Sequence, residues 1–167
     1  MQIRTLIWSD VDSIAAAFAE LGWPGKDAGL YRRYLDEQEA GERTVFVANL
    51  DSGFAGYVGV VWRSDYEPFR AAGIPEVQDF NVLPALGRRG IGTGLMDTAE
   101  DEVARRSPVI GLGCGLYADY GAALLLYLSR GYVPDGRGIA YGARTVAPGE
   151  TIRIDDDAAL MLTKRLH

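Results

Sequence analysis

Two residue types that often carry chemistry are almost missing from this chain. Its 167 residues include one cysteine, Cys114, and one histidine, the final His167. A lone cysteine cannot form an intrachain disulfide, and the pair cannot supply a Cys/His metal cluster. The same count argues against a catalytic triad built on histidine. We therefore expect no metal site, and we look for the chemistry among other side chains.

A basic surplus and long apolar runs are also lacking. Lysine and arginine number 17 against 23 aspartates and glutamates, which gives a net charge of -6 and a pI near 4.8. That balance argues against a nucleic-acid or anionic membrane surface, and it would suit a cationic substrate. The N-terminal residues lack the basic, apolar and small order of a secretion signal, and glycines and Asp119 interrupt the most apolar later region. We expect a soluble, cytoplasmic protein with no nucleic-acid or membrane partner.

The chain does contain apolar residues at regular spacings, in a composition typical of one globular domain over 1–167. The spacings predict helices from Ser9 or Asp10 to about Gly22, over 28–39, after Gly94 and over 121–130. They predict strands over 3–8, 44–50, 54–62, 77–83, 109–114, 137–143 and 159–164, with loops over 63–73 and 144–157. Asp51-Ser52-Gly53 predicts a hairpin turn. The order indicates a mixed α/β (α+β) domain whose mostly antiparallel central sheet carries helices on both faces.

A glycine-rich turn, Arg88-Arg-Gly-Ile-Gly-Thr-Gly94, stands between a predicted strand and a predicted helix. Glycines let the backbone approach a ligand, and the unpaired amides of a helix N-terminus favour phosphate. A P-loop would need a lysine after the second glycine, and none is present. A dinucleotide fingerprint would need glycine in place of Leu95. The turn therefore predicts a different phosphate-bearing cofactor.

Three motifs in a fixed order resemble the GNAT superfamily of acyl-CoA-dependent N-acetyltransferases. They are Val82-Leu-Pro, Arg89-Gly-Ile-Gly-Thr-Gly-Leu-Met96, and Ala123 through Leu126-Tyr127 followed by Gly131-Tyr132. The diagnostic similarity covers about Glu76 to Tyr132. Two positions depart from the family pattern: Gly87 stands where Gln or Arg is common, and Tyr120 stands where many relatives carry an asparagine that contacts the cofactor arm.

The resemblance implies direct transfer of an acetyl group from acetyl-CoA to a primary amine of a small molecule or peptide, without a metal. It implies that the backbone of Val82 lies beside the pantetheine arm of acetyl-CoA and that the backbone of the turn surrounds its pyrophosphate. The cofactor-binding residues implied in this way are Val82, Leu83, Arg88, Arg89, Gly90, Ile91, Gly92, Thr93 and Gly94. It also implies that Tyr127 assists the leaving thiolate, and it admits a homodimer.

The amine must lose a proton, so we look for a base on the strand before the turn. Glu76 resembles the family carboxylate that activates amines, while Asp79 and a water chain are the alternatives. In an undistorted strand Glu76 and Asp79 point to opposite faces, although a bulge would change that parity. The alternative function is a noncatalytic acyl-CoA-binding or sensor module that keeps the cofactor turn but cannot activate an amine.

Overall fold

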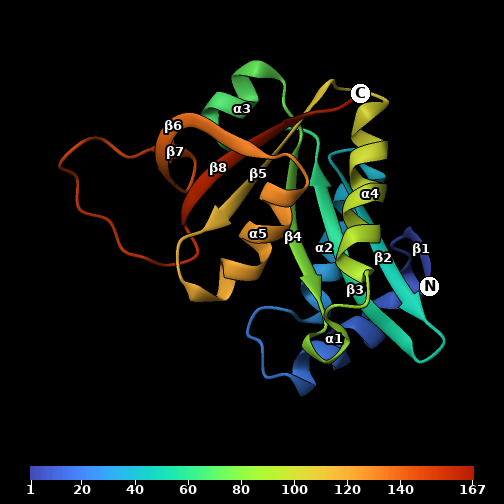
Figure 1. Ribbon diagram of the computed structural model, residues 1–167. Helices are drawn as coiled ribbons and strands as arrows, with labels where there is room; N and C mark the ends of the chain where they lie inside the picture. The colour runs from blue at the N-terminus through green and yellow to red at the C-terminus, as the bar shows by residue number, and fades with distance from the viewer. The chain divides into compact units, whose positions relative to one another are not determined.

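The computed structural model describes residues 1–167, in which helices and strands alternate along the chain (Figure 1). Eight strands are hydrogen-bonded in the order β1-β2-β3-β4-β5-β8-β6-β7. β4 and β5 run parallel, whereas β1-β2, β2-β3, β5-β8, β6-β8 and β6-β7 are antiparallel. The mixed, mostly antiparallel sheet confirms the predicted α/β (α+β) class.

The chain divides into two compact units. The first contains Met1–Trp62 and Gln78–Glu102, and the second contains Arg63–Val77 and Val103–His167. β4 therefore gives its first two residues to the second unit and the others to the first.

The first unit builds its sheet from an N-terminal strand and a hairpin. Its elements are β1 (Gln2–Thr5), η1 (Trp8–Asp10), α1 (Val11–Glu20), α2 (Ala28–Glu39), β2 (Arg43–Leu50), β3 (Gly53–Val61), most of β4 (Glu76–Val82), η2 (Pro84–Leu86) and most of α4 (Ile91–Ala104). Leu50 pairs with Gly53 across a two-residue turn, which confirms the predicted hairpin.

Neighbouring residues of β3 show that helices cover both faces of the sheet in this unit. Tyr57 lies in a buried cluster with Phe18 of α1 and Tyr31 of α2. A Cβ added at Gly56, which points to the opposite face, would lie 3.4 Å from a methyl carbon of Leu95 in α4. Successive strand residues face opposite sides, so α1 and α2 cover one face and α4 covers the other.

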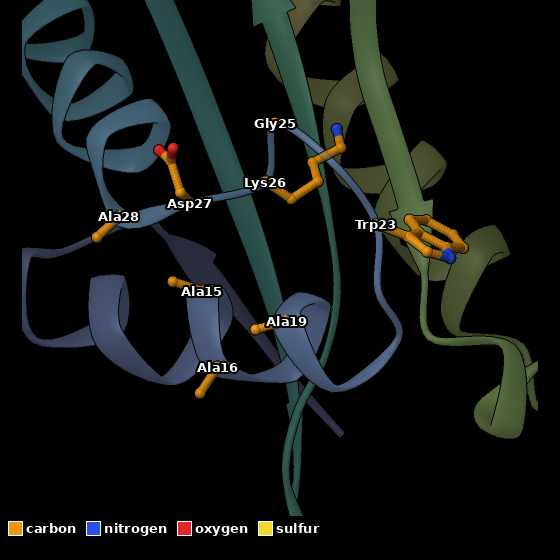
Figure 2. A pocket seen from close by; sticks show the side chains of 8 residues that line it. All are labelled: Ala15, Ala16, Ala19, Trp23, Gly25, Lys26, Asp27 and Ala28. Atoms are coloured by element: carbon orange, nitrogen blue, oxygen red, sulfur yellow. The ribbon is translucent and has the colours of Figure 1, made fainter.

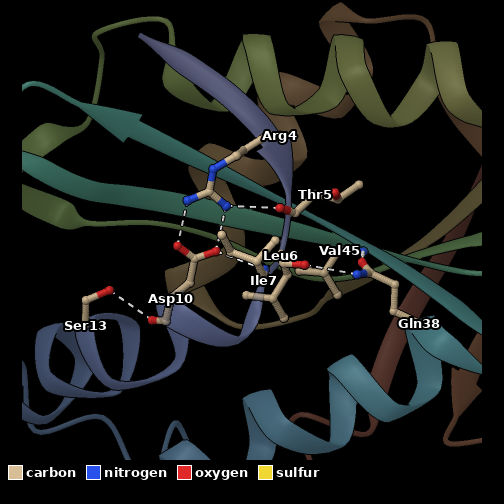
Figure 3. A network of polar contacts seen from close by, with 8 residues as sticks. All are labelled: Arg4, Thr5, Leu6, Ile7, Asp10, Ser13, Gln38 and Val45. Atoms are coloured by element: carbon tan, nitrogen blue, oxygen red, sulfur yellow. Dashed lines mark hydrogen bonds and ion pairs between the residues drawn. The ribbon is translucent and has the colours of Figure 1, made fainter.

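A network of polar contacts fixes the chain between β1 and α1 (Figure 3). Both terminal nitrogens of Arg4 donate to the Asp10 carboxylate at 2.7 Å, and the Ile7 amide donates to the same group at 3.0 Å. Asp10 precedes α1 as predicted, but its side chain caps no α1 amide. Nearby, the Gln38 side chain donates to the Leu6 carbonyl and accepts from the Val45 amide.

The second unit surrounds β5 with strands and two short helices. Its elements are α3 (Glu67–Ala72), the start of β4, β5 (Val109–Gly115), η3 (Ala118–Tyr120), α5 (Gly121–Ser129), β6 (Val133–Tyr141), β7 (Arg144–Thr145) and β8 (Ala158–Arg165). β4 pairs with β5 at Glu76–Gly111 and Val77–Leu112. A Cβ at Gly111 would lie 2.3 Å from the Phe69 ring, so this glycine allows α3 to lie against β5.

Several element predictions differ from the structure. The sequence predicts a loop over 63–73, but Glu67–Ala72 forms α3, which has proline in its first turn and ends at the left-handed Gly73. Such a helix is too short for apolar spacing to reveal. β6 begins at Val133, four residues before the predicted start at 137. The prediction misses these residues because Gly136 and Gly138 interrupt the apolar alternation. β7 lies inside the predicted loop over 144–157. Separately, no helix has the length and apolar character needed to cross a membrane.

Candidate active site

The glycine-rich turn joins β4 to α4 in the first unit. α4 begins at Ile91 and not after Gly94 as predicted, so Gly92 and Gly94 lie in its first two turns. Arg88 and Gly90 before it have positive φ angles of 62° and 78°. Gly90 tolerates this left-handed conformation because it lacks a Cβ. The two residues reverse the chain and direct it into the helix.

Three backbone amides at the start of α4 have no acceptor within the helix. The Gly94 amide donates to the Gly90 carbonyl at 2.9 Å, which is the first bond of the helical ladder. Helix geometry leaves the amides of Ile91, Gly92 and Thr93 without an intrahelical acceptor. Such amides, with the positive end of the helix dipole, suit a phosphate group.

Gly94 has a different function from the residues before it. Its amide is already bonded, and a Cβ at this position would lie 2.8 Å from Met1 and 3.1 Å from Ile3. The lack of a side chain therefore lets α4 pack closely against the N-terminal strand. The Gly94 amide is therefore not among the amides that we propose for phosphate binding.

The backbone at the end of β4 is placed by β3. A Cβ at Gly56 would lie 2.6 Å from the Asn81 carbonyl oxygen and 3.0 Å from Val82 Cα, so only glycine permits this approach. The Leu83 amide donates to the Ala55 carbonyl at 2.9 Å. Because successive extended residues turn their amides to opposite sides, the Val82 amide faces away from β3. This orientation fits the predicted contact with an acyl-donor arm.

The two turn arginines are both exposed. Arg89 lines a surface hollow of about 520 Å³ together with Met1, Leu50, Asp51 and Ser52. Its neighbours are therefore the β2–β3 turn and the N-terminus. Arg88 does not line this hollow.

Asp79 lies within β4 and binds four side chains. Its φ angle is 56°, which is uncommon for a residue other than glycine and departs from the extended conformation of a strand. One carboxylate oxygen is paired with the Lys26 ammonium and accepts the Asn81 amide at 2.8 Å. The other accepts the hydroxyl of Tyr34 at 2.8 Å and the hydroxyl of Tyr57. The backbone distortion of β4 thus lies at Asp79 itself.

These partners decide the charge of Asp79. Burial alone would raise its pKa, but the Lys26 charge and the hydrogen bonds from Lys26, Tyr57 and Tyr34 outweigh burial and hold the pKa below its ordinary value. A carboxylate with a low pKa and four partners is a poor acceptor for a substrate proton. We therefore favour Glu76 over Asp79 as the base.

Lys26 reaches Asp79 from the segment between α1 and α2. Its ammonium also donates to the Tyr57 hydroxyl at 2.9 Å. Behind it, Lys26 and Trp23 border a cavity of about 350 Å³ whose floor includes Ala15 and Ala19 of α1. The Lys26 side chain extends away from these alanines (Figure 2). The segment is thus tied to β4, and sequence reasoning missed this tie because 53 residues separate its two ends.

Glu76 lies in the second unit, at the start of β4. The residue is 8% exposed, and its carboxylate accepts the hydroxyl of Ser64, which is itself fully buried. The Asp79 carboxylate, by contrast, is bound by Lys26 and by side chains of α2, β3 and β4. Sequence reasoning also missed Ser64, since a serine in a predicted loop carries no distinguishing signal.

Tyr127 is buried in α5, in the same unit as Glu76. Burial raises its pKa, and the neighbouring Cys114 raises it further. Its ring makes an edge contact with Tyr132, with centroids 5.9 Å apart. The phenol therefore keeps its proton at neutral pH, as a hydrogen-bond donor must.

A cavity of about 300 Å³ lies where β5 meets η3 and α5. Cys114, Gly115, Tyr120 and Leu124 are among its lining residues. A Cβ at Gly115 would lie 2.4 Å from the Tyr120 ring, so this ring covers the end of the strand. The Tyr120 hydroxyl donates to Asp156 at 3.0 Å. The residue that departs from the family asparagine is thus bonded to the acidic loop over 155–157.

The middle of the chain matches a family model described as an acetyltransferase (GNAT) domain, over residues 41–134. The chain belongs to the GNAT acetyltransferases. The matched region, which includes β4, the turn, α4 and α5, contains all the predicted site residues. No curated protein sequence gives a significant match.

Solved GNAT structures have the same fold at low sequence identity. A ribosomal-protein-alanine N-acetyltransferase from Brucella melitensis is 20% identical, with a TM-score of 0.71 over 99% of this chain and 100% of that chain. The yncA protein of Salmonella typhimurium, solved with its cofactor acetyl-CoA, is 20% identical, with a TM-score of 0.69 over 100% and 94%. A spermidine N-acetyltransferase chimera from Vibrio cholerae and hSSAT is 18% identical, with a TM-score of 0.68 over 98% and 94%.

Proposed function

We propose that this acetyltransferase transfers an acetyl group from acetyl-CoA directly to a primary amine of a small molecule or peptide. The observation that carries the proposal is the group of amides at Ile91, Gly92 and Thr93, which have no acceptor in the helix and lie within the matched family region. The net charge of -6 favours a cationic acceptor. Similar structures that span nearly the whole chain support a single working domain over 1–167.

Several groups of the first unit would hold acetyl-CoA. The amides of Ile91, Gly92 and Thr93 would bind the diphosphate, with Arg88 or Arg89 adding positive charge. The outward amide of Val82 would bind the pantetheine arm next to Leu83. Bound there, acetyl-CoA would supply an acetyl group activated as a thioester.

Glu76 would accept the proton of the incoming amine. An alkylamine with a pKa of about 10.4 is mostly protonated at pH 7, and forming the neutral amine costs about 4 to 5 kcal/mol. A carboxylate held in place reduces this free-energy cost by accepting the amine proton directly or through water. Glu76 has a fixed hydrogen-bond partner and lies on the strand that leads to the turn.

Tyr127 would donate a hydrogen bond to the sulfur that leaves. Burial keeps its phenol protonated. A phenol is a slightly weaker acid than a thiol, so we assign Tyr127 to hydrogen bonding of the developing thiolate before any complete proton transfer.

Release of CoA in the presence of amines tests this function. Purified protein is incubated with acetyl-CoA and a panel of alkylamines, polyamines and peptides, and free thiol is measured over time. Release that depends on the amine is expected, and intact-mass measurement then identifies the acetylated product. Saturable acetyl-CoA binding without release for any amine would instead support the noncatalytic module.

The Tyr127→Phe variant sharpens the same assay. The change removes one hydroxyl, so turnover should fall by about tenfold or more while acetyl-CoA affinity stays close to wild type. Unchanged turnover under conditions where chemistry limits the rate would remove the proposed role of Tyr127.

A further inference from the structure

The Ser64 hydroxyl both donates and accepts a hydrogen bond. The side chain is fully buried, and its hydroxyl oxygen accepts the Tyr66 amide at 3.0 Å. The same hydroxyl donates to the Glu76 carboxylate. Because the Tyr66 amide already uses a lone pair of Ser64, the hydroxyl proton is directed at Glu76.

The segment that carries Ser64 is held by β6 and its neighbourhood. The Tyr66 hydroxyl donates to Asp135 at 2.9 Å, and the Glu67 amide donates to the Ala143 carbonyl at 3.1 Å. The Tyr66 ring meets Phe69 edge to face, with centroids 5.0 Å apart. These contacts fix the backbone, so Ser64 has little freedom to turn away from Glu76.

Glu76 is held from the other side by its own strand. It pairs with Gly111 of β5, and its side chain enters a region where only 8% of the residue is exposed. A buried carboxylate needs hydrogen-bond donors to remain ionised. The Ser64 hydroxyl is such a donor.

We propose that Ser64 is a positioning residue that orients Glu76 and keeps it ionised as the base for the acceptor amine. The inference rests on the proposed function, in which Glu76 accepts the amine proton. Ser64 touches neither substrate, and it acts only through the carboxylate. Loss of its hydrogen bond removes support from the charged form, so Glu76 would hold its proton to higher pH.

The test is the pH dependence of turnover in Ser64→Ala. We expect the acid-side limb of the kcat profile to move upward by about one pH unit, since a hydrogen bond to a charged group has an effect of this order. The acceptor amine has the same pKa in both assays, so the difference reports the enzyme. The substitution leaves unchanged the charged and titratable groups on the packed segments, which include Arg63, Asp65, Tyr66, Glu67, Arg70, Cys114, Asp135 and Arg137.

Two matched variants separate positioning from packing. Ser64→Thr keeps a hydroxyl and should return the limb toward the wild-type position. Tyr66→Phe removes the bond to Asp135 from the same segment but leaves the Ser64 hydroxyl and the Tyr66 amide in place, so its limb should move much less than that of Ser64→Ala. Thermal unfolding of each variant shows whether the fold is retained.

A second readout needs no turnover. Carboxyl-carbon NMR, with the Glu76 signal assigned through Glu76→Gln, should show Glu76 titrating at higher pH in Ser64→Ala. An unmoved kcat limb and an unmoved Glu76 titration in folded Ser64→Ala would overturn the inference alone. Wild-type turnover in Glu76→Gln would instead contradict the base assigned in the proposed function.

Discussion

Asp79 brings a negative charge into a largely buried position, and its neighbours determine what that charge does. Its side chain and that of Lys26 are each 18% exposed, and the carboxylate also accepts bonds from Tyr34, Tyr57 and Asn81. A charge buried in this way is stable only while its partners are present. The residue therefore has a structural role in β4, and we propose Glu76 as the proton acceptor.

Replacement of Lys26 by methionine should destabilise the protein by about 3 kcal/mol. The change keeps an unbranched side chain of nearly the same length but leaves the Asp79 carboxylate without its counter-ion, which costs several kcal/mol at a buried position. Urea unfolding at pH 7 measures the loss. The matched double variant, Lys26→Met with Asp79→Asn, should recover much of it. Equal stabilities for wild type and Lys26→Met would contradict a stabilising ion pair.

The same pair has a predicted pH dependence. The folded pKa of Asp79 lies below the unfolded value of about 3.9. The contribution to stability is therefore fully present above that pH, and it is lost as the pH falls through the folded pKa. Wild type should lose more stability than Lys26→Met between pH 5 and about pH 3.

At the scale of elements, periodic segments could be predicted from the sequence and short ones could not. α2 lies over the predicted residues 28–39, and the β2–β3 hairpin also has its predicted turn, because both repeat their apolar pattern over many residues. α3 and β7 could not be predicted, because neither is long enough to show an apolar period. α4 begins at Ile91, four residues before the predicted start at Leu95, because glycine is a poor helix former and its presence argues against a helix.

Replacement of Gly92 by leucine tests the function of the first turn of α4. Leucine is a better helix former than glycine by up to about 1 kcal/mol, so the fold should not weaken through loss of helix propensity. Its side chain would nevertheless crowd a ligand on the neighbouring amides, and CoA affinity should fall by at least about tenfold. Calorimetry measures the affinity, with thermal unfolding as the control. Unaltered CoA affinity in a folded variant would contradict the proposal that this turn binds the diphosphate.

At the scale of the whole molecule, the family, the mixed sheet and the order of the motifs could be read from the sequence. The residues that support the candidate site could not. Lys26 meets Asp79, and Ser64 meets Glu76, only through contacts between distant segments. No sequence pattern around Lys26 or Ser64 predicts these contacts. The tertiary fold supplies the charge and hydrogen bonds that distinguish two carboxylates three residues apart.

A crystal structure of the protein with CoA is the most direct test of the account. It should place the diphosphate within hydrogen-bond distance of the amides of Ile91, Gly92 and Thr93, with the pantetheine arm beside the backbone of Val82. A diphosphate bound elsewhere on the protein, with those three amides in contact with solvent, would contradict the account.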